Sequence, residues 1–284
     1  MASCWDEGEL TPTPEPELIY GKYTLPQGDH DYDDDIVEFY KQYTSLILYK
    51  FTAKDFGWSP AWNAAYDVSK DTAQDIESNV SKYYAPAADE QYVGEQLQLL
   101  YNKLFDYLSD ELMHLLPQKI LLCSTIEQVP VGLGYDPTPE ERTFLNVYSG
   151  YYHIAISWGS AKILAMTAEE RNQFKVDLCT TYFEVISSAL ERPQDFFLIS
   201  TYTNDMAEGD IYAEGILDYN NRNSVDKDWL AIENSIEDLE AEGGVLNPAV
   251  DVNNKIREKY TIMTNFFKDR YKFDIQAIGN DVER

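Results

Sequence analysis

The chain has 284 residues, with 22 lysines and arginines against 50 aspartates and glutamates. The formal charge of −28 excludes a protein that holds a nucleic-acid backbone by bulk electrostatic attraction, and it disfavours adhesion to an anionic membrane surface. A content of 44% hydrophobic residues excludes disorder throughout, and no apolar run is long enough to predict a helix that spans a bilayer. Three cysteines cannot form a disulfide framework, and three histidines are few for a metalloprotein.

The first residues resemble the cleavage site of a bacterial lipoprotein. Small residues precede Cys4, which would be the lipid-attachment site, and an acidic stretch follows it. The charged and apolar leader of a signal peptide is not part of this sequence, so a plain acidic tail is the alternative. A proline-rich spacer extends from Thr11 to Pro16. We therefore expect a disordered acidic tether over residues 1–30 and a single domain over residues 31–284.

Apolar residues at helical spacing mark the start of the domain. Steps of three and four residues from Ile36 to Ile47 predict a helix that begins near Asp35. The denser apolar segment from Leu46 to Phe51 predicts a short strand after this helix.

The same spacing predicts a long helix from Asp89 to about Leu116, with an unbroken stripe of valine and leucine. Gln96 lies off this stripe, so we expect it to face solvent. Pro117 ends the helix, and the short apolar run from Lys119 to Ser124 predicts a buried strand.

The second half of the chain alternates strands and helices. The run from Phe144 to Trp158 predicts one or two strands. Thr167 to Glu170 is a capping-box pattern, which predicts the start of a helix that ends at Arg192. Further helices are predicted after Ser224 and from about Val252. Helices outnumber strands and the strands lie between them, so the fold class is α+β, helix-rich with a small sheet.

Four short segments carry a family resemblance by their order and spacing: Leu48 to Phe51, Leu116 to Leu122, Asp195 to Ser200 and Phe273 to Ile275. From about Asp31 onward the chain resembles the zinc metallohydrolase lipoproteins associated with substrate import, also described as zinc-binding metallopeptidases. The resemblance implies a zincin-like fold with a small mixed sheet. It also implies a His-Glu-x-x-His motif on the helix after the last strand, whose histidines bind Zn²⁺ while the glutamate polarises a water molecule.

That motif is degenerate in this chain. With Phe174 and Leu178 as anchors, the two histidine positions and the catalytic glutamate position of the family fall on Thr180, Glu184 and Thr181. The downstream acidic segment of the family retains Asp228 but loses its last carboxylate. Zinc sites need three or four protein ligands. We therefore expect four vestigial positions (Thr180, Thr181, Glu184 and Asp228), with no catalytic residue, no metal ligand and no cofactor.

Other candidate ligands and nucleophiles are better explained as structural residues. We expect His153 to be a strand residue with a hydrogen-bonded ring, and His114 to be a helix-end residue near a surface Glu111. Cys179 is expected to be a small buried side chain.

The resemblance implies that proteins of this kind are encoded beside outer-membrane TonB-dependent transporters. We expect a non-catalytic lipoprotein, a pseudoenzyme, lipid-anchored at the outer membrane on the surface of a Gram-negative bacterium. It would assist nutrient import by binding a peptide, a glycan or the transport complex. The alternative is an active zinc metallopeptidase or hydrolase with an atypical site, for which zinc would be the cofactor.

Overall fold

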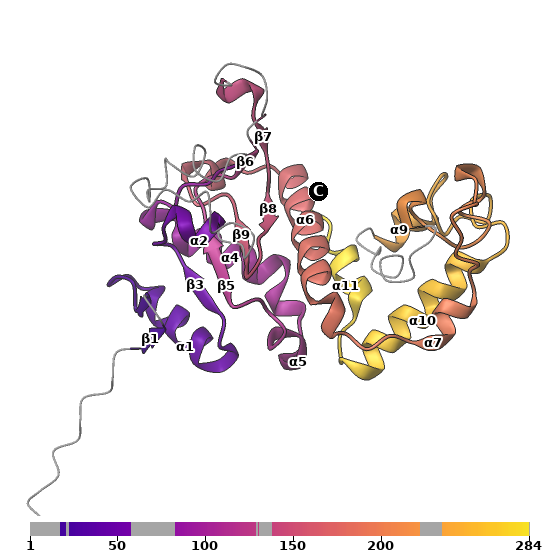
Figure 1. The fold of residues 1–284 in the computed structure, drawn as a ribbon, viewed down its shortest axis with the longest axis horizontal. Helices are drawn as coiled ribbons and strands as arrows, with labels where there is room; N and C mark the ends of the chain where they lie inside the picture. The colour runs from indigo at the N-terminus through magenta and orange to yellow at the C-terminus, as the bar shows by residue number, and fades with distance from the viewer. Residues whose placement is uncertain are drawn as a thin grey trace, which may run out of the picture.

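The computed structural model describes residues 18–20, 23–57, 83–128, 130, 138–221 and 235–283. The predicted class is confirmed, because helices surround a small mixed sheet in an α+β arrangement (Figure 1). The central sheet has the strand order β3-β5-β9-β8, in which the first three strands are parallel and the edge strand is antiparallel. Its strands are β3 (Leu46–Leu48), β5 (Lys119–Leu122), β9 (His153–Ile156) and β8 (Val147–Ser149). No helix of the described part is long and apolar enough to cross a membrane.

Two smaller antiparallel sheets flank the central one. They are formed by β1 (Leu18–Tyr20) with β2 (Tyr23–Leu25), and by β4 (Tyr83–Tyr84), β6 (Glu127–Gln128) and β7 (Thr143–Phe144). Leu25 is buried in the main hydrophobic cluster. The ordered fold therefore includes residues 23–30, which the sequence analysis assigned to the tether.

The strands predicted at Leu46 and Lys119 are confirmed. Ile47 pairs with Ile120, and Ile120 pairs with Ile154, in parallel register. These residues are fully buried within the main hydrophobic cluster. A parallel strand that is buried on both faces has a continuous apolar run rather than an alternating one. The short apolar runs of β3 and β5 were therefore sufficient to predict these two strands.

The first predicted helix is α1 (Asp33–Tyr43), which ends where Thr44 takes a left-handed conformation. The prediction of one long helix from Asp89 to Leu116 is wrong. The segment divides into a short 3₁₀ turn (Glu90–Tyr92), α4 (Val93–Lys103), a second 3₁₀ turn (Phe105–Tyr107) and α5 (Asp110–Met113).

The helix breaks at Leu104, whose φ of −147° and ψ of −59° leave the helical region. Ser109 then starts α5 by accepting a hydrogen bond from the Leu112 amide. Leu104 at the break and Leu112 after it are both buried. The leucine stripe therefore continues through a bend, and periodicity alone does not reveal the bend.

Gln96 is buried instead of facing solvent, which corrects the prediction. Its Nε2 donates to the carbonyl oxygens of Cys123, Ile156 and Ser157 at 3.2, 2.9 and 2.7 Å. These carbonyls follow or end β5 and β9. A polar side chain on α4 thus holds the carboxyl ends of two strands at a fixed separation. It supplies a donor to the Ser157 carbonyl, whereas the carbonyls of Cys123 and Ile156 also accept from the backbone amides of Gly159 and Cys123.

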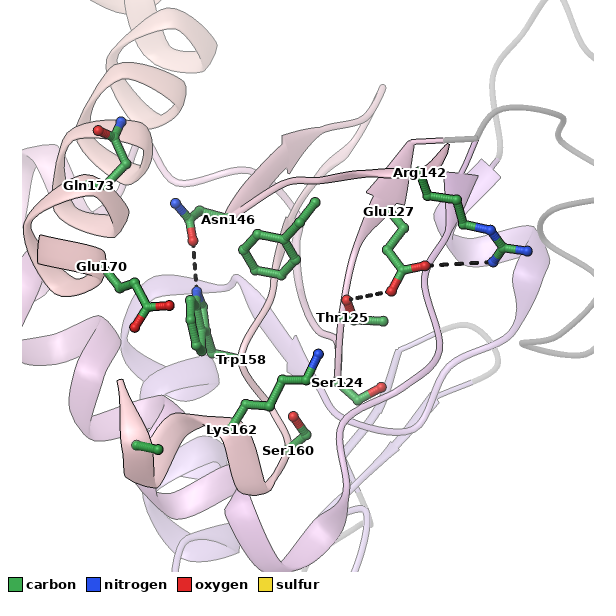
Figure 2. A pocket seen from close by; sticks show the side chains of 12 residues that line it. Ser124, Thr125, Glu127, Arg142, Asn146, Trp158, Ser160, Lys162, Glu170 and Gln173 are labelled. Atoms are coloured by element: carbon green, nitrogen blue, oxygen red, sulfur yellow. Dashed lines mark hydrogen bonds and ion pairs between the residues drawn. The ribbon is translucent and has the colours of Figure 1, made fainter. Parts of the chain in front are cut away.

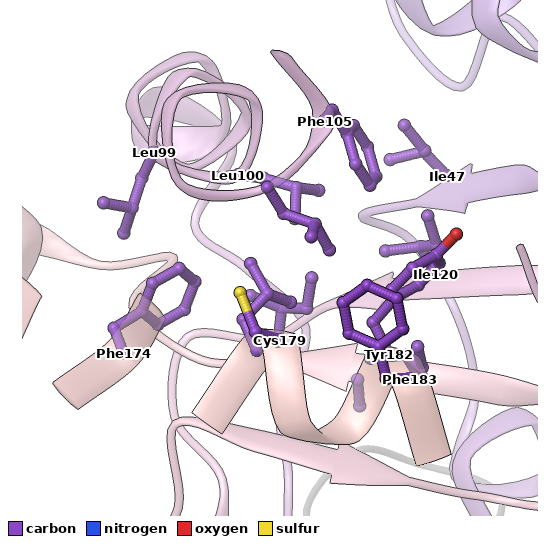
Figure 3. Packing of buried hydrophobic residues seen from close by; sticks show 14 of the residues in the cluster. Ile47, Leu99, Leu100, Phe105, Ile120, Phe174, Cys179, Tyr182 and Phe183 are labelled. Atoms are coloured by element: carbon purple, nitrogen blue, oxygen red, sulfur yellow. The ribbon is translucent and has the colours of Figure 1, made fainter. Parts of the chain in front are cut away.

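The capping box at Thr167 is confirmed and starts α6 (Ala168–Ile186). Glu170 donates its amide to the Thr167 hydroxyl, and its carboxylate accepts from the Thr167 amide. Figure 3 shows the apolar face of α6 packed against α4 and the central strands. A 3₁₀ turn (Ser187–Ala189) follows, so the helix ends before the predicted Arg192.

The remaining helices are α2 (Ala53–Gly57), α7 (Gln194–Leu198), α9 (Ile236–Glu240), α10 (Lys255–Arg270) and α11 (Ile275–Asn280). The helix predicted from about Val252 is confirmed as α10. The predicted start of the helix after Ser224 lies outside the described residues. Ser235 caps α9 separately, so no single helix extends from Ser224 to Leu239.

Residues 278–283 are fixed against α4 and α6 by buried cations. Lys103 contacts Asp281 and Glu283 at 3.1 and 2.7 Å, and Lys175 donates to the carbonyl oxygens of Ile278 and Asp281. The side chain of Asn172 on α6 exchanges two hydrogen bonds with the backbone of Glu283. Burial lowers the pKa of Lys175, whereas the two carboxylates raise the pKa of Lys103 despite its burial.

Candidate functional site

A cavity of about 510 Å³ opens at the carboxyl ends of β5 and β9 (Figure 2). Ser124 and Trp158, which follow these two strands, lie on one side of it. Phe144 of β7 and the first turns of α6 complete the wall. The carboxyl ends of parallel strands are a common place for ligands, because the connecting loops diverge there and leave a crevice.

A chain of hydrogen bonds makes one wall of the cavity rigid. The indole Nε1 of Trp158 donates to Asn146 Oδ1 at 2.7 Å, and Asn146 Nδ2 donates to Asp177 Oδ2 at 2.7 Å. Gln173 Nε2 donates to the other oxygen of Asp177 at 2.8 Å. The Asp177 carboxylate therefore fixes the orientation of both amides, and through Asn146 it fixes the indole.

Trp158 has a strained backbone at this wall. Its φ is +80°, in the left-handed region that a bulky residue rarely adopts. The next residue, Gly159, lies so close to Ala88 that a Cβ at this position would collide with it. Such strain persists only where the surroundings impose it, and it concentrates at functional sites. Trp158 is only 8% exposed, whereas Phe144, which packs edge-on against it, is 43% exposed.

The two carboxylates that line the cavity have partners of their own. Glu127 lies 3.6 Å from Arg142 and accepts a hydrogen bond from Thr125. Glu170 belongs to the capping box of α6, and hydrogen bonds from Thr167 lower its pKa. Lys162 also lines the cavity, and Figure 2 shows its side chain extending into it.

The edge strand β8 begins beside the cavity, directly after Asn146. Gly150 donates to His153, and Ser157 donates to Asn146, so alternate residues of this strand bond to β9. In an antiparallel pair the intervening residues turn both backbone groups the other way. Val147 and Ser149 therefore direct their N–H and C=O groups away from β9, toward an edge that carries no further strand in the described part of the chain.

The structure places three of the four predicted vestigial positions on the C-terminal half of α6. Thr180 and Glu184 share a helix face with Gln173 and Asp177, because steps of four, three and four residues separate them. Thr181 lies beside this face. The cavity is lined by the first turns of α6 and not by these three residues. Asp228 and Cys4 lie outside the described residues.

The side chains at these positions do not fit a zinc ion. The hydroxyl of Thr180 donates to the Val176 carbonyl of its own helix at 2.8 Å, and Glu184 contributes a single exposed carboxylate. Within the described ranges, no three histidine, cysteine, aspartate or glutamate side chains lie close enough together to bind a metal.

The other candidate residues have structural surroundings. His153 is buried on β9 as predicted, but its Nε2 has no hydrogen-bond partner among the described residues. Burial, with a smaller contribution from Lys119, lowers its pKa to about 3. His114 is the exposed C-cap of α5 and Glu111 lies at the surface, both as predicted, and Glu111 also pairs with Arg270. Cys179 is buried in the core, also as predicted.

Comparisons with known proteins leave the family open. No family model matches the sequence, and no curated protein matches it significantly. A solved structure described as a "putative zinc-binding metallo-peptidase" from Bacteroides caccae superposes with a TM-score of 0.44 at 11% identity. That match covers 66% of this chain and 72% of the other. A match at this level carries no argument about the function of this protein.

Sequence reasoning missed most of the cavity. Asn146, Trp158 and Lys162 fall in or after a predicted strand, and no motif distinguishes them. The capping box identified Glu170 as a helix start but not as part of a cavity wall. The Trp158-Gly159 pair, a bulky residue before a glycine at a strand end, was the one local signal of a tight turn.

Proposed function

We propose that this protein binds an extended peptide along the edge of β8 without hydrolysing it. The observation that carries this proposal is the outward-facing backbone of Val147 and Ser149, in the strand that directly follows Asn146 of the cavity wall. An extended peptide can add a strand to such an edge, where main-chain hydrogen bonds supply affinity and a neighbouring pocket supplies selectivity.

The polar face of α6 supports binding over hydrolysis. A peptide beside β8 would pass α6, because α6 packs against this strand and Asp177 is joined to Asn146. The residues farther along that face, Thr180 and Glu184, supply a hydroxyl that is bonded within its helix and one carboxylate. This is too small a donor set to activate water through a metal.

A role in nutrient import extends this proposal. The small residues before Cys4, the acidic spacer and the order of elements resemble the import-associated lipoproteins. The protein would then be lipid-anchored at the outer membrane of a Gram-negative bacterium. It would hold peptides near a TonB-dependent transporter or contact that complex directly.

The edge-strand proposal can be tested with two substitutions at one exposed residue. Ser149→Pro removes the outward N–H without touching the ladder to β9, because proline is tolerated at an edge position that faces away from the sheet. Ser149→Ala keeps the N–H and is the matched control. With fluorescent heptapeptide mixtures, we expect Ser149→Pro to weaken binding about tenfold and Ser149→Ala to leave it unchanged.

The same peptides incubated with the protein and added zinc should stay intact by mass spectrometry. Cleavage that depends on the protein would overturn the non-catalytic assignment. Retention on a glycan array without any peptide binding, or equal peptide binding by both variants, would overturn the edge-strand proposal.

A further inference from the structure

Lys162 is unusual among the cations of this acidic chain. All other lysines and arginines of the described part contact a carboxylate, a carbonyl or another recorded partner. Lys162 has no such contact within these residues. With 50 acidic residues in the chain, an unpaired ammonium group is not explained by a shortage of carboxylates.

The position of this ammonium group makes it available to a ligand. Lys162 lies on a short 3₁₀ turn (Ala161–Ala165) after β9, and its side chain extends into the cavity near Ser124 and Ser160 (Figure 2). The cavity carboxylates are already occupied, Glu127 by Arg142 and Glu170 by Thr167. Among the described residues that line the cavity, one positive group therefore has no carboxylate partner, and the hydroxyls of Ser124 and Ser160 belong to the same lining.

The rest of the wall selects an elongated ligand group rather than a small ion. The exposed ring of Phe144 and the fixed indole of Trp158 provide an apolar surface in the same cavity as Lys162. A volume of about 510 Å³ accommodates a side chain with several methylene groups. An aliphatic stem against the rings and a carboxylate against the ammonium group would fill both parts of the cavity.

We propose that this cavity is a specificity pocket for a carboxylate of the bound peptide, held by Lys162. The proposal rests on the proposed function, since it names the peptide class that the β8 edge would present to the cavity. The carboxylate could be an acidic side chain or the free carboxyl terminus of the peptide, and the experiment separates these two sources.

The net charge of −28 does not oppose this assignment at physiological salt. Charges farther apart than about 8 Å are largely screened at about 0.15 M salt, whereas a contact pair in a partly enclosed cavity is not. The overall charge would slow the approach of an acidic peptide at low salt. Binding is therefore best measured near physiological ionic strength.

The test uses three mixtures of amidated heptapeptides that differ only at the central residue, which is glutamate, glutamine or lysine. We expect the protein to bind the glutamate mixture about tenfold more tightly than the glutamine mixture. Lys162→Met should remove this preference, and Lys162→Arg should retain it. Lys162→Glu should reverse it in favour of the lysine mixture, a gain that a merely misfolded variant cannot show.

Lys268→Met is the matched control, because Lys268 is an exposed lysine on α10, away from the cavity. A fourth mixture, with a central glutamine and a free carboxyl terminus, identifies the terminal carboxylate as the ligand if it matches the glutamate mixture. Equal binding of all mixtures by the protein and by Lys162→Met would overturn the carboxylate pocket and leave the edge-strand proposal standing. Failure of every mixture to bind would overturn both.

Discussion

Gln96 shows how one side chain determines the geometry of the cavity. Its amide holds three carbonyls at the ends of β5 and β9, from which Ser124 and Trp158 emerge. Gln96→Met leaves the Ser157 carbonyl buried without its donor, and should lower the free energy of unfolding by about 1–3 kcal/mol. Gln96→Glu should cost more at neutral pH, because a carboxylate would face carbonyl oxygens. Urea denaturation of both variants measures this order, and equal stability of Gln96→Met and the unmodified protein would contradict it.

His153 should contribute a pH dependence to stability. Its pKa in the folded protein is about 3, whereas the unfolded chain takes up the proton at about 6.5. The unfolded state therefore binds more protons between these values, and stability falls as the pH is lowered through that window, by up to about 1.4 kcal/mol per unit.

The variant His153→Phe isolates this effect. Phenylalanine fits among Phe56 and Tyr148, which already contact the imidazole ring. Between about pH 7 and pH 5, the unmodified protein should lose roughly 2 kcal/mol more stability than the variant in urea titrations. Parallel losses in both proteins would show that His153 does not remain neutral in the fold.

Among the elements, α6 matters most, because its first turns line the cavity and its middle packs against the core. Thr167→Ala removes the hydroxyl that accepts from Glu170 and should destabilise the protein by about 1 kcal/mol. Thr167→Ser keeps the cap and serves as control. Thermal unfolding followed by circular dichroism distinguishes the two variants, and an alanine variant as stable as the serine variant would contradict the expected role of the cap.

Local chemistry explains which elements were predictable. The capping box of α6 and the apolar runs of β3 and β5 depend on neighbours in sequence, and all three were found. The break at Leu104 and the burial of Gln96 depend on residues far away in the chain. Tyr182 of α6, for example, donates to the Leu112 carbonyl beyond the break. The spacing of apolar residues indicates which face of a helix is buried, but it does not indicate where the helix axis bends.

The candidate site was predicted less well than the fold, for a related reason. Its wall is assembled from β7, the turn after β9 and α6, and each contributes polar residues that are ordinary in isolation. The predicted vestigial positions on α6 depended on alignment with a motif. The cavity depends on Asp177 and Asn146 meeting across 31 positions of sequence.

For the whole molecule, the excess of acidic residues should limit stability at low ionic strength. With a charge of −28, we expect the mutual repulsion of the carboxylates to outweigh the attraction within the local ion pairs. Raising sodium chloride from about 0.02 to about 0.3 M should increase the Tm by roughly 3 °C, because the screening length shortens across this range. An uncharged osmolyte at equal osmolality is the control, and a constant or falling Tm would contradict the expectation.

The anchoring of residues 278–283 has a consequence for biosynthesis. The ammonium groups of Lys103 and Lys175 lie in the interior of a domain whose sheet is complete by residue 156, yet their acceptors are supplied more than a hundred positions later. While the ribosome is still translating the intervening helices, both amines must stay hydrated, so α4 and α6 cannot settle into final contact. Maturation of the amino-terminal half should therefore wait until residues 278–283 have left the ribosome.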